Sequence, residues 1–251
     1  MATSLEQHRV EIARNRDLWL GKPRLRAIYR DFYRSIADRI DPSLAGPVVE
    51  LGSGIGAIKD VLPQCLTTDL FDHPWIDQRE NAYRLSFDSA TLSHLILFDV
   101  WHHLRYPGTA LRELRRVLRR NGRLILFEPA ASWTGRLVYG CFHHEPLGLN
   151  EPLTWEAPDG VSPDDADYFA AQGAATRLFW WKTDKVALEG WSVREVTPIV
   201  SFTYFASGGF SGKERGGALF QSALKQFDAV ASRWPRLFAA RLLVVLEKVA
   251  D

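Results

Sequence analysis

Three alternating glycines follow a short apolar run and could form a ligand-binding turn. The run is Val48–Leu51, which is typical of a buried strand, and the turn is Gly52-Ser53-Gly54-Ile55-Gly56. Glycines permit positive φ angles and let a ligand approach the backbone, and the start of the helix expected next offers unpaired N–H groups. Glu50 stands just before the turn. A carboxylate there would repel a pyrophosphate but suits the ammonium group of an amino-acid ligand.

Asp69 is the next residue with a candidate role. It lies at the end of the second expected strand, Cys65–Leu70, and follows Gly56 by 13 positions. An acidic residue at that point can accept hydrogen bonds from both hydroxyls of a ribose. Gly52, Gly54 and Ala57 also satisfy the dinucleotide fingerprint, so the glycines alone leave a nicotinamide cofactor open as an alternative.

Two pairs of adjacent histidines could take part in proton transfer. His102 and His103 follow the expected strand Leu92–Phe98, at the edge of the sheet where ligands bind. A histidine there could take a proton from a bound hydroxyl group.

The second histidine pair, His143-His144, lies between Cys141 and Glu145. Adjacent histidines rarely chelate one ion, and no second pair of ligands stands at a suitable spacing. We therefore expect His143 to act as a base or a substrate contact, and we expect no metal site.

The elements that must position these residues alternate between strand and helix. From residue 47 onward we expect strands at 48–51, 65–70, 92–98, 123–127, 191–197 and 241–249, and helices near 109–120, 183–188 and 217–231. This alternation predicts an α/β fold with a mainly parallel sheet covered on both faces. The last two strands are expected to be antiparallel.

We expect a single domain over residues 1–251 with four parts. These are a helical arm (1–44), a cofactor-binding half (45–130), an inserted lid (131–185) and a sheet-closing half (186–251). Residues 137–176 hold seven carboxylates and no Lys or Arg, whereas residues 1–40 hold nine Lys or Arg against five acids. The opposite charges suggest that the arm docks on the lid over the site.

Five stretches together resemble the class I S-adenosylmethionine-dependent methyltransferases, and most closely their type 11 small-molecule branch. They are Val49–Gly56, Thr68-Asp69, Asn81–Phe87, Phe98–Leu104 and Leu111–Glu128. The resemblance covers roughly residues 45–130 and the terminal strands. It implies a three-layer Rossmann-like fold with an antiparallel final strand, S-adenosylmethionine as cofactor, and methyl transfer to a small-molecule acceptor.

The resemblance also implies which residues bind the cofactor: Glu50, Gly52, Ser53, Gly54, Gly56, Asp69, Asn81, Ala82, Phe98 and Asp99. Glu50 would organise the loop and meet the methionine ammonium, the loop would pass under the methionine, and Asp69 would hold the ribose. Asn81 stands where the family usually has Asp, and its carbonyl can still accept from the adenine amino group. Ala82 would offer its N–H to the adenine ring, and Phe98 and Asp99 would line the reactive end.

The net charge and the lengths of the apolar runs bear on possible partners and on location. The net charge is +1, and the arginines between residues 112 and 123 fit a solvated helix face, so we expect no nucleic-acid partner. The longest apolar runs, such as Leu242–Leu246, are far below the ~18 residues that span a bilayer, so we expect a soluble, cytoplasmic protein. Two alternatives stay open: a nicotinamide-dependent oxidoreductase, which Glu50 and the antiparallel strands oppose, and a non-catalytic relative that has kept the cofactor pocket.

Overall fold

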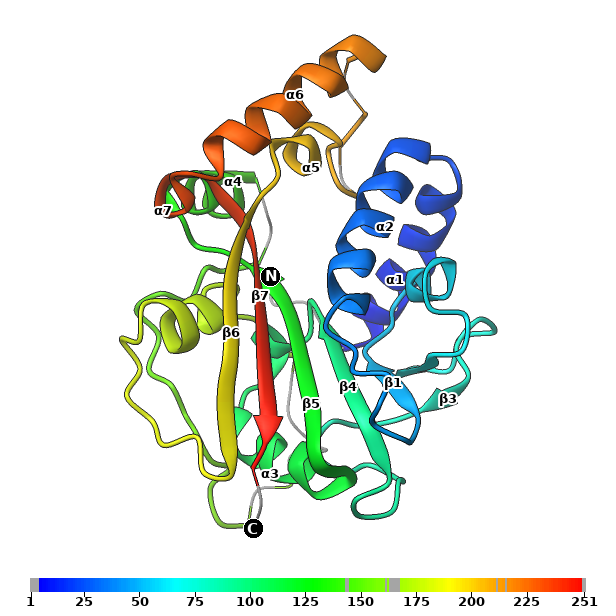
Figure 1. Ribbon diagram of the computed structural model, residues 1–251, viewed down its shortest axis with the longest axis vertical. Helices are drawn as coiled ribbons and strands as arrows, with labels where there is room; N and C mark the ends of the chain where they lie inside the picture. The colour runs from blue at the N-terminus through cyan, green and yellow to red at the C-terminus, as the bar shows by residue number, and fades with distance from the viewer. Residues whose placement is uncertain are drawn as a thin grey trace.

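A seven-stranded sheet runs through the computed structural model, which describes residues 5–142, 145–160, 162, 168–210, 212–214 and 216–249 (Figure 1). Its order is β3-β2-β1-β4-β5-β7-β6. The strands are β1 (Val48–Leu51), β2 (Leu66–Asp69), β3 (Gln78–Arg79), β4 (Leu92–Phe98), β5 (Leu118–Pro129), β6 (Trp191–Val200) and β7 (Ala239–Lys248). The first five are parallel, and β7 lies antiparallel between β5 and β6. The predicted α/β fold with an antiparallel final strand is confirmed.

The central strands are apolar because both faces of the sheet are covered. All seven residues of β4 are buried. Leu95 and Leu97 point into one core, whereas Ile96 and Phe98 point into the other. The strand pairs with β5 in register through Ile96 and Ile125. This alternation of side chains between two cores fixes which face of the sheet each flanking helix must cover.

Seven helices flank the sheet in the described part of the chain: α1 (Leu5–Leu20), α2 (Pro23–Ala37), α3 (Pro107–Val117), α4 (Trp133–Phe142), α5 (Phe202–Ala206), α6 (Ala218–Ala231) and α7 (Pro235–Phe238). Three other short helical segments are described: the 3₁₀ turns η1 (Ala57–Asp60) and η2 (Trp101–His103), and a short π-helix, η4 (Thr176–Trp180). In Figure 1, α6 projects beyond one end of the sheet, and β7 ends at the other. No helix among the described residues is long and apolar enough to cross a bilayer.

The helical arm is a layer of the fold. Tyr29, Phe32 and Ile36 of α2 are buried against Phe98 and Phe127 of the sheet. The ring of Phe32 lies 5.0 Å from that of Phe127. Apolar residues three and four positions apart place one whole face of α2 on the sheet, so this helix covers a core.

The docking of the arm on the lid stays a prediction, because Asp164, Asp165 and Asp167 of the lid lie outside the described residues. The two segments do meet at one point, where the His8 ring of α1 lies 5.2 Å from the Tyr168 ring.

The ion pairs described at these two segments lie within one segment or go to other parts of the domain. Arg39, just after α2, pairs with Glu195 of β6 at 2.7 Å, and Arg30 pairs with Asp60 of η1 at 3.1 Å. In the lid, Glu156 pairs with Arg112 of α3. Among the ion pairs described, the basic arm is therefore tied to the body of the domain.

Two expected helices differ from the structure. The helix expected to run to Arg120 ends at Val117, because Leu118 already pairs with Leu92 as the first residue of β5. The helix expected near residues 183–188 is not formed, and the helical turn lies earlier, at Thr176–Trp180. Lys182 has a φ of 56°, a left-handed conformation that cannot continue a right-handed helix.

Truncating Phe32 tests whether α2 is part of the core. Phe32 is 5% exposed, so Phe32→Ala should lower the free energy of unfolding by about 3–5 kcal/mol through lost contacts and a cavity. Phe220→Ala in α6, where the side chain is 47% exposed, serves as the matched control and should change it by less than about 1 kcal/mol. Urea unfolding followed by circular dichroism measures both. Equal effects of the two variants would contradict the two-core description.

Candidate functional site

The glycine turn adopts backbone angles that favour glycine. Gly52, Gly54 and Gly56 have φ angles of 66°, 50° and 71°. A methyl group added to Gly54 would meet nothing within 4 Å, whereas one added to Gly52 would collide with Val100. The turn is therefore packed against the chain after β4 on one side and open at Gly54, where a ligand can lie directly on the backbone.

Asp69, the last residue of β2, is hydrogen-bonded to the glycine turn that follows β1. Its Oδ2 accepts from the Gly54 N–H at 2.9 Å, and its Oδ1 accepts from the Phe71 N–H at 3.2 Å. The residue is 5% exposed, and burial raises the pKa of its carboxyl group. Each carboxylate oxygen has more than one lone pair, so Asp69 can hold the turn and still accept from a ligand.

A tryptophan and an arginine brace the turn from its outer side. The Trp75 indole N–H donates to the Gly54 carbonyl at 2.8 Å. The Arg16 guanidinium lies 4.5 Å from the centre of that indole ring and donates to the Ile55 carbonyl. Sequence reasoning missed both residues, since neither stands near the glycines in the sequence.

Glu50 is fully buried beneath the turn. Its Oε1 accepts from the Tyr33 hydroxyl of α2 at 2.9 Å, whereas Oε2 has no hydrogen-bond partner in the described part of the chain. Burial raises the pKa of this carboxyl group to about 7. A buried carboxylate oxygen without a donor is costly, and a cationic or N–H-bearing ligand would satisfy it.

The predicted adenine contacts lie in a tight turn after β3. Asn81 Oδ1 accepts from the Tyr83 N–H at 2.9 Å, which fixes the side chain, and Ala82 is half-buried beside it. Glu80, which sequence reasoning missed, is buried and accepts from the Ser86 N–H at 2.9 Å. The local sequence thus forms a rigid turn one strand beyond Asp69.

The structure gives Phe98 and Asp99 roles within the protein. The Phe98 ring stacks on Tyr29 at 5.3 Å and belongs to the core beneath α2. The Asp99 carboxylate accepts from both terminal nitrogens of Arg241, at 2.7 and 2.6 Å. Arg241 is 1% exposed and lies within 6 Å of four aromatic rings: Phe32, Phe98, Phe127 and Tyr204. Local sequence patterns could not predict these contacts, because the partner of Phe98 comes from α2 and the partner of Asp99 comes from β7.

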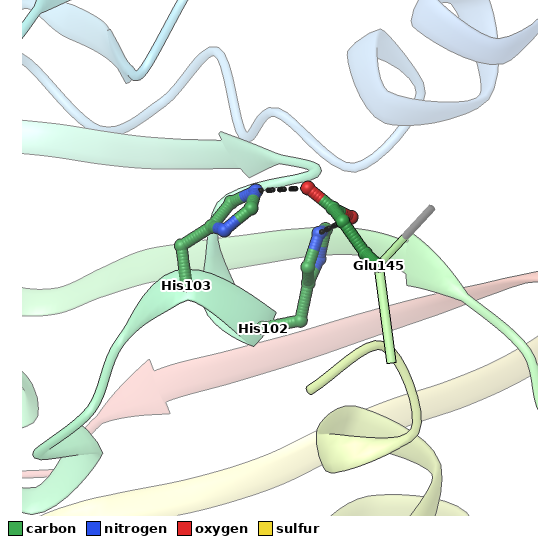
Figure 2. Close-up of side chains that lie close together, drawn as sticks. All are labelled: His102, His103 and Glu145. Carbon is green, nitrogen blue, oxygen red and sulfur yellow. Dashed lines mark ion pairs between the residues drawn. The ribbon is translucent and has the colours of Figure 1, made fainter. Parts of the chain in front are cut away.

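His102 and His103 lie in η2 with their rings 4.1 Å apart, and Glu145 of the lid lies over both (Figure 2). His102 is 2% exposed, and its Nδ1 donates to Glu128 Oε2 at 2.6 Å. Its Nε2 is 3.5 Å from Glu145 Oε2, and the Nε2 of His103 is 3.7 Å from Glu145 Oε1. The Nδ1 of His103 donates to the Phe169 carbonyl at 2.9 Å.

The surroundings favour the protonated form of the His102 ring and the neutral form of the His103 ring. Burial by itself lowers the pKa of an imidazole, but the charges of Glu128 and Glu145 and the hydrogen bond to Glu128 raise the pKa of His102 to about 10. Burial and the neighbouring charge of His102 lower the pKa of His103 to about 3. His102, when it carries this proton, cannot accept another, whereas neutral His103 presents a lone pair at Nε2.

Sequence reasoning found the two histidines but missed the carboxylates that control them. Glu128 is the last residue but one of β5, and its Oε1 accepts from the N–H groups of Val100 and Trp101 at 2.9 and 2.8 Å. A buried Glu at the end of an apolar strand was the available signal. His143, the third predicted catalytic residue, lies outside the described residues.

Comparison with known proteins identifies a methyltransferase domain in part of the chain. Residues 49–126 match a family model described as a methyltransferase domain. A comparison with curated proteins gave no match.

Three solved structures share the fold, each with a TM-score of 0.51. One is a complex between the Haloferax volcanii Trm112 methyltransferase activator and a putative methyltransferase (14% identity, 96% of each chain). Another is a geranyl diphosphate methyltransferase in complex with S-adenosylmethionine (12%, 88% of this chain and 85% of that one). The third is an Archaeoglobus fulgidus methyltransferase (10%, 89% and 94%). Residues 49–126 therefore match a methyltransferase domain, and the chain as a whole has the fold of these methyltransferase structures.

Proposed function

We propose that the chain binds S-adenosylmethionine along the glycine turn and transfers its methyl group to a small-molecule acceptor beneath the lid. Two observations carry this proposal: the open side of Gly54, and the unpartnered Oε2 of buried Glu50 near the end of the strand that leads into the turn. A methionine portion lying on Gly54 would bring its ammonium group to that oxygen. Both the space and the charge suit this ligand.

The order of the strands suggests where the ribose and the adenine of the cofactor would bind. Asp69 ends β2, next to β1 in the sheet, and would accept the ribose hydroxyls with the lone pairs that the turn leaves over. Asn81 and Ala82 follow β3, the next strand outward, and would meet the adenine. The cofactor would thus cross three neighbouring strand ends in the direction of the sheet order.

The acceptor is placed on the other side of the glycine turn, toward the histidines. η2 follows β4, and His103 lies within ring-contact distance of His8 of α1 and Tyr168 of the lid, at 5.6 and 5.2 Å. Methyl transfer from a sulfonium needs in-line approach and exclusion of water, and these aromatic groups can provide both.

A hollow of about 360 Å³, which none of these histidines lines, is a second candidate place for a small-molecule acceptor. It lies between the end of β5, α4 and α7 and is lined by Ala131, Trp133, Arg136, Trp180, Trp181 and Arg236. Its volume is in the range of small-molecule sites, and its aromatic rings and arginines suit an acceptor with apolar and anionic parts.

The sheet opposes the nicotinamide alternative. Dinucleotide-binding sheets of the common type are built from parallel strands in the order 3-2-1-4-5-6, whereas here the antiparallel β7 lies between β5 and β6. The non-catalytic alternative is separated from ours by turnover of an acceptor.

Gly54→Val tests where the cofactor lies. The branched side chain would fill the open space over the turn and resist the positive φ, so binding of S-adenosylmethionine should fall below detection in calorimetry. Gly160→Val in the lid is the matched control, because Gly160 also has a positive φ (78°) and nothing within 4 Å of an added methyl group. That variant should bind normally. Equal affinity in Gly54→Val and the wild type would contradict the placement.

The pKa of Glu50 predicts how binding depends on pH. An ammonium group at Oε2 would lower this pKa from about 7, so the complex would hold fewer protons than the free protein. The affinity for S-adenosylmethionine should therefore rise as the pH increases from about 5 to about 7, by at most roughly tenfold for each pH unit. Glu50→Gln should bind more weakly and lose this dependence. Calorimetry in buffers of different ionisation enthalpy would show proton release in the wild type only, and its absence there would contradict the Glu50 contact.

A further inference from the structure

Three side chains from two segments far apart in the sequence converge on one point near the carboxyl end of β4. They are His102 and His103 of η2 and Glu145 of the lid, and their ligand atoms all lie within 4.8 Å of one another (Figure 2). We propose that the Nε2 atoms of the two histidines and the carboxylate of Glu145 bind a divalent transition-metal ion, with Zn²⁺ as the best fit. The proposal does not depend on the cofactor.

The distances between these atoms fit ligands of one ion better than they fit hydrogen bonds. The Nε2–Oε separations are 3.5 Å at His102 and 3.7 Å at His103, beyond the usual 2.7–3.2 Å of an N–H···O bond. Ligands at about 2.0–2.2 Å from a tetrahedral zinc ion lie roughly 3.3–3.5 Å apart. Each nitrogen faces a different oxygen of the Glu145 carboxylate, and the ligand atoms all lie within 4.8 Å of one another, so side-chain movement of about 1 Å would let them meet at a common centre.

The opposite side of each ring is held as a metal ligand requires. The Nδ1 of His102 donates to Glu128 at 2.6 Å, and the Nδ1 of His103 donates to the Phe169 carbonyl at 2.9 Å. Histidines that bind metals almost always donate their other N–H to a carboxylate or a backbone carbonyl, which directs the second lone pair at the ion. Both imidazoles show this arrangement.

Glu145 is oriented in the same way by its own partners. The Gln172 side-chain N–H donates to Oε2 at 2.7 Å, and the Tyr168 hydroxyl donates to Oε1. A carboxylate oxygen can accept a hydrogen bond and still bind a metal ion, so these bonds are compatible with ligation. Ligating carboxylates are commonly held by such hydrogen bonds.

The charges of the cluster also match a divalent ion. Glu128 and Glu145 contribute two negative charges in a buried setting, and a dication on neutral imidazoles would balance them. Without the ion, a proton on His102 balances only one of these two negative charges. The second possible group, Asp99 with His102 and Glu128, is a poorer site, because Arg241 already holds both oxygens of Asp99.

Sequence reasoning expected no metal because it considered only the adjacent pair His143-His144, and adjacent histidines rarely share one ion. At His102 and His103, the 3₁₀ turn brings the two rings to 4.1 Å, and the lid supplies a third ligand more than 40 positions away. Two histidines and one glutamate are a known zinc donor set that leaves a fourth position open. His8 lies near that side, with its ring 5.6 Å from His103 and its Nδ1 without a hydrogen-bond partner among the described residues.

Zinc binding by the full chain, without any cofactor, tests the site. Protein stripped with a chelator should bind about one Zn²⁺ per chain, measured by competition with a chromophoric chelator, and Co²⁺ should give the visible absorption of a tetrahedral site. His102→Asn and His103→Asn keep a side-chain donor near Nδ1 but remove Nε2, and each should weaken binding by at least about tenfold. Glu145→Gln removes the charge from the lid without shortening the side chain and should do the same, which covers the case that a histidine variant fails to fold.

His94→Gln is the matched control. His94 is a buried histidine of the same strand that precedes η2, and its Nε2 accepts from the Asp41 N–H at 3.0 Å, a bond that the glutamine carbonyl can replace. This variant should bind zinc as the wild type does. Circular dichroism melting would check each fold, and added zinc should raise the Tm of the wild type and His94→Gln only. No saturable binding in the wild type, or equal binding in the folded ligand variants, would overturn the proposal.

Discussion

Four carboxylates lie at one edge of the sheet, and much of the structure depends on how they are satisfied. Asp69 ends β2, Glu50 precedes the end of β1, Asp99 follows β4 and Glu128 lies near the end of β5. These strands are neighbours, so their ends bring like charges together in a largely buried setting. Each charge needs a donor or a cation, because an uncompensated buried carboxylate is unfavourable.

The donors that compensate these carboxylates differ from strand to strand. Backbone N–H groups of the glycine turn and of Phe71 hold Asp69, Arg241 from β7 holds Asp99, and His102 with two backbone N–H groups holds Glu128. Of these four, only Glu50 keeps an oxygen without a donor in the described part of the chain. S-adenosylmethionine brings an ammonium and a sulfonium, so a cationic cofactor suits this edge.

The local patterns of the sequence predicted the fold well where one segment determines its own structure. Largely apolar runs marked β1 and β4, and the glycines marked the turn with positive φ. Patterns failed where a distant partner decides. Leu118 is the first residue of β5 because it pairs with Leu92, and α2 is a core layer because its apolar face matches the sheet. For the site, Asp69 and the histidines could be found, but Glu145 reaches them only through the folding of the lid, and Arg241 meets Asp99 only through the antiparallel β7.

A crystal structure of the full chain with S-adenosylhomocysteine tests the central claim, that this carboxylate edge is the cofactor site, most directly. The account predicts the methionine portion on Gly54 with its ammonium at Glu50 Oε2, the ribose hydroxyls on Asp69, and the sulfur directed toward η2. The contrary result is a cofactor bound away from the turn, or one that leaves Glu50 Oε2 without a partner.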